Sequence, residues 1–264
     1  MHLQRSSHVN EKFYLDGRVA VITGGGTGIG RGTALILAEH GADIVLAGRR
    51  PEPLESTAKE VEALGRRALA LPTDVTDVAA CQQLVGTTLR EFGRIDILVN
   101  NAGGAETKSI LKWPDDDFDH VVALNFGAVW HLSRAAATPM LEQGKGAIVN
   151  ISSGASLVGM PQAAPYGAAK AAVNNLTASM AAAWTGKGIR VNGIAVGAVR
   201  AATLIDDAAR YGLDPEAIGM TNALGRLGEP EEIGYGVLFF ASDASSFCSG
   251  QTLFMHGGPG PAGI

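Results

Sequence analysis

The amino-acid sequence predicts an α/β protein with a doubly wound parallel β-sheet, of the kind that binds dinucleotides, flanked by helices on both faces. Short apolar segments rich in β-branched residues alternate with segments of helical periodicity through most of the chain. The strand segments are continuous apolar runs, so both of their faces should be covered, as they are in a parallel sheet. The first segment runs into a glycine-rich turn that opens a helix, which is the phosphate-binding arrangement of such folds.

Seven segments are expected to be strands, with helices connecting them. The strands are residues 18–24, 43–48, 67–75, 95–103, 146–153, 189–197 and 251–258. The helices are expected at 31–41, at 51–65 after an opening proline, at 77–93, as two stretches across 115–143, at 166–187, and as a helical insertion at 203–235. Two βαβαβ halves in this order produce the doubly wound sheet.

No linker or change of composition divides the 264 residues, so we expect a single Rossmann-type domain over 13–264. A flexible N-terminal arm should precede it at 1–12, and a substrate loop should lie at about 198–225. Apolar residues make up 46% and charged residues 18% of the chain, which is a globular composition with enough length for a large core.

The bulk properties disfavour several classes of protein. The net charge is −5 and no basic block is present, which disfavours nucleic-acid binding. No apolar run reaches the roughly 18 residues of a membrane span, and the first twelve residues are polar, unlike a signal peptide. Cys81 and Cys248 lie far apart and the six histidines are scattered, so neither a disulfide framework nor a metal site is expected. These features predict a cytoplasmic protein.

The glycine-rich turn, TGGGTGIG, spans Thr23 to Gly30 and joins the first strand to the first helix. Gly24 allows a tight turn, Gly28 lets the backbone approach a pyrophosphate, and Gly30 permits close packing of helix on strand. The helix N-terminus adds N–H groups and a positive dipole end. The turn therefore predicts a dinucleotide cofactor.

With three residues between its first two glycines, this turn resembles that of the short-chain dehydrogenase/reductase family. NNAG at 100–103, TDV at 73–75 and the closing segment 225–258 are also similar to family motifs, so the resemblance covers nearly the whole chain. It implies a nicotinamide cofactor and a homotetramer. The cofactor contacts that we carry over are Gly24, Thr27, Gly28, Ile29, Gly30, Asp74, Val75, Asn101, Ala102, Gly103, Tyr166, Lys170, Gly197 and Val199.

Proton chemistry is predicted for YGAAK, which places Tyr166 and Lys170 four residues apart on one helix face. A tyrosine pKa near 10 is high for a proton shuttle, and a nearby ammonium should lower it. Tyr166 could then donate a proton to a carbonyl or accept one from an alcohol, while hydride passes to or from a nicotinamide. The resemblance assigns the same roles and has Lys170 bind the nicotinamide ribose.

Two further residues complete the catalytic set that the resemblance implies. Ser153, thirteen residues before Tyr166, matches the serine that binds the reacting oxygen, and the spacing favours it over Ser152. Asn125 matches the asparagine that holds a water on the lysine. The alternative for an asparagine within a helix is a local backbone bond or a kink.

Cofactor choice is indicated by DIVLAGRR at 43–50. NAD-dependent relatives place a carboxylate near Gly48, eighteen residues after Gly30, to bind the ribose 2′-hydroxyl. Gly48 offers none, and Arg49 follows it with a planar guanidinium that suits a 2′-phosphate and can stack beside adenine. Arg50 either contributes or faces water. We therefore expect NADP(H), with NAD(H) possible.

The substrate side departs from the family pattern. Val196 and Ala201 stand where the family has Pro and Thr, so Thr203 or the backbone near Val199 must hold the carboxamide. Residues 200–223 form either an apolar lid or plain packing. Similarity of NNAGG and VNGI to bacterial hydroxysteroid dehydrogenases predicts a hydrophobic secondary alcohol or ketone. The alternatives are a reductase of enoyl thioesters and a non-catalytic NADP(H)-sensing protein.

Overall fold

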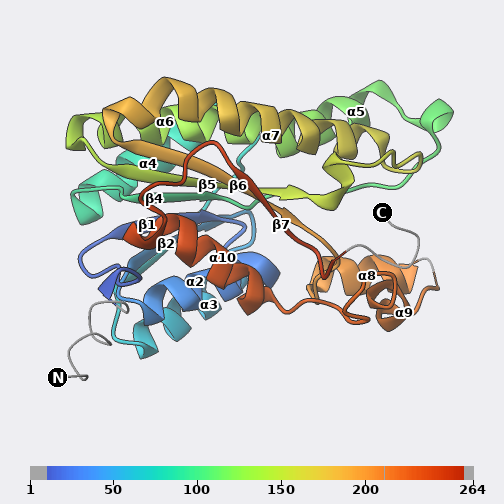
Figure 1. The fold of residues 1–264 in the computed structure, drawn as a ribbon, viewed down its shortest axis with the longest axis horizontal. Helices are drawn as coiled ribbons and strands as arrows, with labels where there is room; N and C mark the ends of the chain where they lie inside the picture. The colour runs from blue at the N-terminus through green and yellow to red at the C-terminus, as the bar shows by residue number, and fades with distance from the viewer. Residues whose placement is uncertain (1–10, 211, 259–264) are drawn as a thin grey trace.

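The computed structural model describes residues 11–210 and 212–258, so residues 1–10 of the expected arm lie outside the described part. The described chain forms a parallel sheet of seven strands in the order β3-β2-β1-β4-β5-β6-β7 (Figure 1). The predicted doubly wound α/β fold is confirmed. The strands are β1 Val19–Thr23, β2 Asp43–Gly48, β3 Ala68–Pro72, β4 Ile97–Asn100, β5 Gly146–Ser153, β6 Ile189–Val196 and β7 Thr252–Met255.

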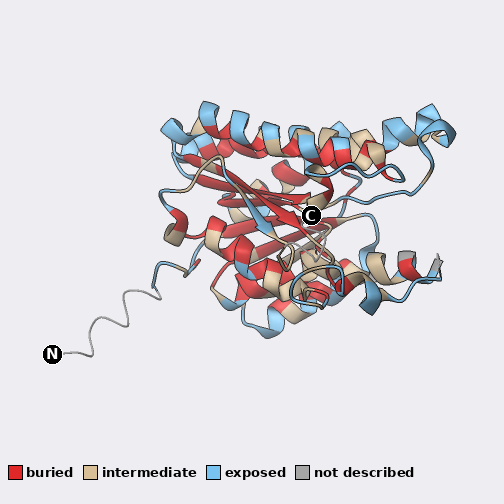
Figure 2. Cartoon of the chain, turned by 45° about the vertical axis from the view of Figure 1, so that its right-hand side comes forward, coloured by how far each residue is buried: buried red, intermediate tan, exposed pale blue. Residues whose placement is uncertain are grey.

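Helices cover both faces of the sheet, as the apolar strands require. One layer holds α2 (Gly28–Glu39), α3 (Pro51–Ala63) and α10 (Pro230–Ala241). The other holds α4 (Val78–Phe92), α5 (Asp115–Val122), α6 (Ala128–Gln143) and α7 (Ala164–Trp184). Alternate residues of β1 enter the two cores, because Ile22 packs with the first layer and Val21 with the second. Figure 2 shows the inner strands as a buried layer between helices whose outer faces are exposed, whereas β7 at one edge of the sheet is partly exposed.

The predicted helical insertion at 203–235 is wrong at its end. Only α8 (Ala202–Arg210) and α9 (Pro215–Gly219) form the insertion, and α10 is a separate helix that lies beside α2 on the sheet. Pro230 and a capping box between Glu229 and Glu232 begin α10. The apolar side chains of α10 pack into the core with α2. The periodicity of the sequence could not show whether this segment packs on the sheet or continues the insertion.

The expected pair of helices across 115–143 is one helical stretch with a π-helical turn, Ala123–Gly127, between α5 and α6. Such turns insert an extra residue into a helix and are frequent at functional sites. Asn125 lies in this turn, and its Nδ2 donates a hydrogen bond to the Val121 carbonyl at 3.0 Å. Within the described residues, no helix combines the length and the apolar character that a membrane crossing requires.

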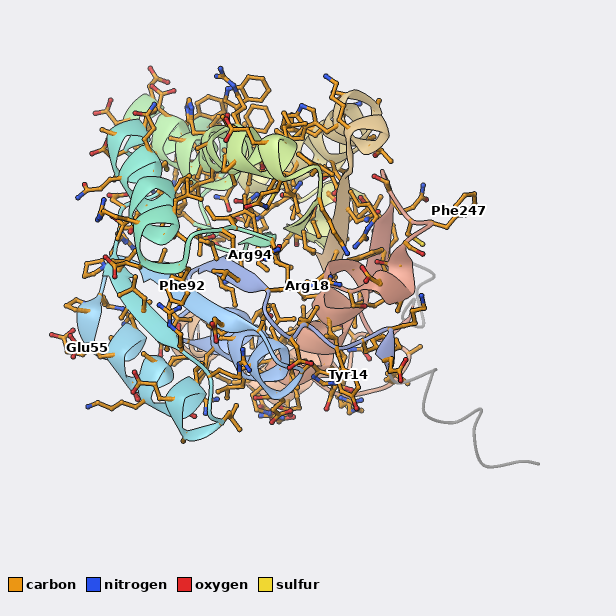
Figure 3. The ribbon with its side chains drawn as sticks, turned by 90° about the vertical axis from the view of Figure 1, so that its left-hand side faces the viewer. Tyr14, Arg18, Glu55, Phe92, Arg94 and Phe247 are labelled. Atoms are coloured by element: carbon orange, nitrogen blue, oxygen red, sulfur yellow. The ribbon has the colours of Figure 1, made fainter. Side chains whose placement is uncertain are left out.

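The amino and carboxyl ends of the strands, which we call the amino and carboxyl edges of the sheet, differ in their contacts. At the amino ends of the strands, seen in Figure 3, Arg18 pairs with Asp243 at 2.8 Å and donates to the Ala241 carbonyl. Arg94 pairs with the Asp96 carboxylate, which also accepts from the Val19 amide. These bonds fix the amino edge. The carboxyl ends, where the glycine turn and the motifs after β4, β5 and β6 meet, enclose a cavity.

Candidate active site

The cavity at the carboxyl edge has a volume of about 590 Å³. It lies where an open α/β sheet reverses its strand order, between β1 and β4, which is where ligands bind in such folds. Gly30 and Asn125 do not line it. All the other predicted site residues do: Gly24, Thr27, Gly28, Ile29, Arg49, Arg50, Asp74, Val75, Asn101, Ala102, Gly103, Ser153, Tyr166, Lys170, Gly197 and Val199.

The glycine turn brings bare backbone to the cavity wall. Gly24 and Gly28 have φ of 65° and 51°, the left-handed region that favours glycine. A Cβ on Gly28 would lie 3.0 Å from the Ala201 Cβ, so the turn faces the loop after β6 at close range. The first turn of α2 lines the same wall, and its N-cap Thr27 makes no side-chain capping bond. A glycine-rich cradle at a helix N-terminus, with Thr27 and Ile29 as its side chains on the cavity wall, fits the pyrophosphate of a dinucleotide.

Thr23, whose contribution the sequence reasoning missed, locks this turn to the end of β4. Its hydroxyl donates to the Val99 carbonyl and accepts from the amides of Asn101 and Ala102 at 3.0 and 2.9 Å. The Asn101 side chain donates back to the Thr23 carbonyl at 2.8 Å. The available signal in the sequence was the position of this threonine at the end of the first strand, directly before the first glycine of the turn.

Gly30 acts through packing, and its replacement by alanine is expected to destabilise the protein. A Cβ there would lie 2.1 Å from the Gly24 carbonyl oxygen, so the turn would have to move. We expect the free energy of unfolding to fall by about 2–3 kcal/mol and cofactor binding to weaken. Denaturant unfolding and cofactor titration measure both effects.

Gly86→Ala is the matched control, because Gly86 is exposed within α4 and a Cβ there meets nothing within 4 Å. It should stabilise the protein by about 0.5–1 kcal/mol through helix propensity. Equal unfolding energies for the two variants would contradict the packing role of Gly30.

One end of the cavity carries the charged residues predicted to bind adenosine. The Asp74 carboxylate accepts hydrogen bonds from the Thr76 amide at 2.9 Å and its hydroxyl at 2.8 Å. These bonds, with smaller effects of the positive charges of Arg49 and His120, hold the pKa of Asp74 below its usual value. Arg49 therefore acts on Asp74 across this end of the cavity. His120 was missed, although it lies five residues before Asn125 on the same helical stretch.

At the other end, α7 presents Tyr166 and Lys170 side by side. The Lys170 ammonium donates to the Ile151 carbonyl at 2.9 Å and lies 5.7 Å from the centre of the Tyr166 ring. Ser153 is the residue whose side chain lowers the pKa of the Tyr166 hydroxyl, and its own hydroxyl accepts a hydrogen bond from the Ala155 amide at 3.1 Å. Ser152 instead donates to the Lys170 carbonyl at 3.1 Å. The structure thus brings Ser153, and not Ser152, to the tyrosine.

The direction of one pKa differs from the sequence expectation. Burial raises the pKa of Tyr166, and the hydrogen bond from Ser153 offsets only part of this effect. Burial also lowers the pKa of Lys170 to about 8. The expected lowering of the tyrosine pKa by the lysine is wrong for this structure, because desolvation of the phenolate dominates.

Asn125 is fully buried and contacts the backbone of the loop after β4, beside Lys170. Its Nδ2 donates to the Gly104 carbonyl at 2.8 Å, and its Oδ1 accepts from the Gly104 amide at 3.2 Å. A Cβ on Gly103 would lie 2.8 Å from this Oδ1 and 3.2 Å from the Lys170 Nζ. The side chain therefore fixes the loop against which the lysine packs.

A family model described as short chain dehydrogenase matches residues 18–211. The chain belongs to the short-chain dehydrogenase family. Its relatives in this family are dehydrogenases and reductases that use nicotinamide cofactors and act on alcohols and ketones.

Three of these relatives match almost the whole chain. A 3-oxoacyl acyl-carrier-protein reductase of Thermotoga maritima is 35% identical, over 92% of this chain and 98% of the relative. A cis-4-hydroxycyclohexanecarboxylate dehydrogenase of Sinomonas cyclohexanicum is 40% identical, over 91% and 96%. A solved 7α-hydroxysteroid dehydrogenase in complex with NADH and 7-oxo glycochenodeoxycholic acid superposes with a TM-score of 0.88 at 35% identity, over 94% and 96%.

This short-chain dehydrogenase departs from the family pattern in the loop after β6, where Val196 and Ala201 both line the cavity. Val199 forms a bridge with Gly228 and so ties this loop to the residues before α10. The Thr203 side chain and Tyr211 lie outside the described residues. Of the loop after β5, the side chains of Leu157, Val158 and Met160 are exposed.

Proposed function

We propose that the protein transfers a hydride between NADP(H) and a hydrophobic secondary alcohol or ketone, with Tyr166 giving or taking the proton. The observation that carries this proposal is that Tyr166, Ser153 and Lys170 lie together in one cavity with the glycine-rich cradle and the charged residues Arg49 and Asp74. The side-chain chemistry at the two ends matches a carbonyl and a dinucleotide.

Each catalytic side chain has a distinct task in this proposal. The Tyr166 hydroxyl donates its proton to the carbonyl oxygen during reduction, and Ser153 hydrogen-bonds the same oxygen. Lys170 places a positive charge beside the developing phenolate, and Asn125 positions the loop at Gly104. The bound cofactor supplies the hydride or accepts it.

The proposed preference for NADP(H) rests on Arg49, which is exposed at the cavity wall beside Asp74, and on Gly48, which carries no carboxylate. Its guanidinium suits a 2′-phosphate, and Arg50 lines the cavity beside it. The 7α-hydroxysteroid dehydrogenase complex contains NADH, so the comparison does not favour NADP(H) and the proposed preference depends on Gly48, Arg49 and Arg50.

We also propose a homotetramer and a cytoplasmic location. Exposed apolar side chains of Leu253 and Phe254 on β7, with Tyr235 on α10, support contact with another copy. The two free thiols, Cys81 and Cys248, fit a reducing compartment. A monomeric mass in sedimentation would contradict the tetramer.

The function is tested by following nicotinamide absorbance with a panel of apolar ketones, secondary alcohols and enoyl thioesters, with each cofactor in turn. We expect turnover with ketones and alcohols and a preference for NADP(H). Consumption of cofactor by enoyl thioesters alone would replace the proposal by C=C reduction. Cofactor binding without any turnover would indicate a sensing protein.

The pH dependence should differ between the two directions. Ketone reduction needs the Tyr166 proton and the Lys170 charge, so its kcat/KM should hold at neutral pH and fall as pH rises through about 8, where Lys170 loses its proton. Alcohol oxidation needs the phenolate, whose formation the raised pKa delays, so it should be favoured at alkaline pH. A reductive kcat/KM that increases up to pH 9, with circular dichroism unchanged, would contradict this assignment.

A further inference from the structure

The cavity lining that residues 104–107 and 204–218 contribute, which we call the substrate half, is uncharged among the described side chains. Among the described lining residues, ionisable side chains occur at the adenosine end and at Tyr166 and Lys170. The substrate half contains Thr107 and apolar side chains, namely Ala105, Leu204, Ala208, Leu213 and Ile218. None of these groups offers a counter-ion to a charged substrate.

The mouth of the substrate half is acidic. We call residues 104–119, 198–210 and 212–226 the rim, because these segments contribute to its lining and lie on opposite sides of the carboxyl edge, with the start of α5 on one side and α8 and α9 on the other (Figure 1). The described side chains of the rim include eight carboxylates and four lysines and arginines. The rim therefore accounts for four of the five net negative charges of the chain.

Three cations of the rim are already bound to carboxylates. Lys108 pairs with Glu106 at 2.7 Å and also with Asp117. Arg200 pairs with Glu216 at 2.6 Å and Glu229 at 3.1 Å, and Arg226 pairs with Glu232 at 2.7 Å.

Several rim carboxylates remain uncompensated. Asp115, Asp116 and Asp119 are exposed and form no ion pair within the described residues. Lys112 is exposed and does not line the cavity. The Arg210 side chain lies outside the described part. The described charges therefore give the rim a negative potential.

A substrate carboxylate would meet two free-energy penalties on entering the substrate half. The rim repels it, by an amount that salt reduces. Inside the substrate half it would lose water without gaining a counter-ion, which is costly for any unpaired charge. Lys170 does not remove this penalty, since its ammonium is buried and already bound to the Ile151 carbonyl. An uncharged apolar body meets neither penalty and gains from burial.

We infer that this site selects by charge: it takes uncharged ketones and alcohols and rejects carboxylates of the same shape. The inference rests on the proposed function and deepens it. It separates this chain from the relative named for cis-4-hydroxycyclohexanecarboxylate, although the two sequences are 40% identical.

A matched pair of ketones, 4-oxocyclohexanecarboxylate and 4-oxocyclohexanecarboxamide, tests the inference through kcat/KM with NADPH. We expect the amide to exceed the carboxylate by about 30-fold at low salt, and added salt to raise the carboxylate value while leaving the amide value unchanged. Equal values, or a higher value for the carboxylate, would overturn the inference.

A rim variant assigns the effect to its charges. Glu216→Gln removes one rim carboxylate and leaves Arg200 with Glu229 as its remaining partner. We expect the preference for the amide to fall about threefold, in line with one exposed charge. Glu142→Gln makes the same change at an exposed residue near the far end of α6 and should leave the preference unchanged. An unchanged preference in Glu216→Gln would overturn the assignment to the rim.

Failure of the proposed function can be distinguished from failure of the charge inference. If no ketone or alcohol of the panel consumes cofactor, the proposed reaction fails, and calorimetric binding of the same two ketones to the NADPH-loaded protein then decides the charge inference. Binding of the amide alone supports it. Binding of the carboxylate with equal affinity, or of neither ketone, overturns it.

Discussion

Replacing Tyr166 by phenylalanine is expected to lower kcat for ketone reduction by about 10³-fold, with cofactor binding largely intact. The change removes the hydroxyl that hydrogen-bonds Ser153 and leaves the ring beside Lys170. The hydroxyl carries the proton that reduction needs, and because burial raises its pKa, the Lys170 charge is needed to stabilise the phenolate that forms. Stopped-flow absorbance at saturating NADPH measures the chemical step directly.

The matched control is Tyr235→Phe, which removes the hydroxyl of a half-exposed tyrosine on α10 outside the cavity lining. It should leave kcat unchanged. Both variants should bind NADPH as the unchanged protein does in a fluorescence titration. More than a tenth of the original kcat in Tyr166→Phe would assign the proton to another group. Loss of NADPH binding would instead show that the variant disturbs the cradle.

The strands were predictable because a parallel sheet buried on both faces leaves a strong signal in sequence. Segments such as 43–48 and 189–197 are mostly apolar, short and bounded by turns, so their existence and their parallel arrangement could be predicted. The extent of the helical insertion was not predictable in the same way. The periodicity of 203–235 is the same whether Pro230 begins a new helix on the sheet or continues a lid.

The residues of the candidate site could be predicted from motif spacing, but the directions of their pKa shifts could not. Tyr166 and Lys170 share a helix face by periodicity alone. The pKa of Tyr166 depends on how much water the surrounding elements exclude, and this is a tertiary property. The position of Asn125 in a π-helical turn and the presence of His120 beside Asp74 likewise arise from the packing of separate segments.

Replacing Arg49 by aspartate is expected to reverse the cofactor preference. With NADPH, kcat/KM should fall about 100-fold, because a charge-assisted contact worth about 1.5–3 kcal/mol is lost and a repulsive carboxylate is added. With NADH, kcat/KM should hold or rise, since a carboxylate near Gly48 can accept a bond from the ribose 2′-hydroxyl. The ratio of the two kcat/KM values is the quantity to measure.

Arg90→Asp is the control for charge alone, because Arg90 is an exposed arginine in the last turn of α4 and does not line the cavity. It makes the same change in net charge and should leave the ratio unaltered. The ratio isolates the 2′-position, since damage to the pyrophosphate cradle or to Tyr166 would lower both values together. An unchanged ratio in Arg49→Asp would remove Arg49 from the cofactor site. The preference would then have to come from Arg50, whose own replacement by aspartate would shift the ratio in its place.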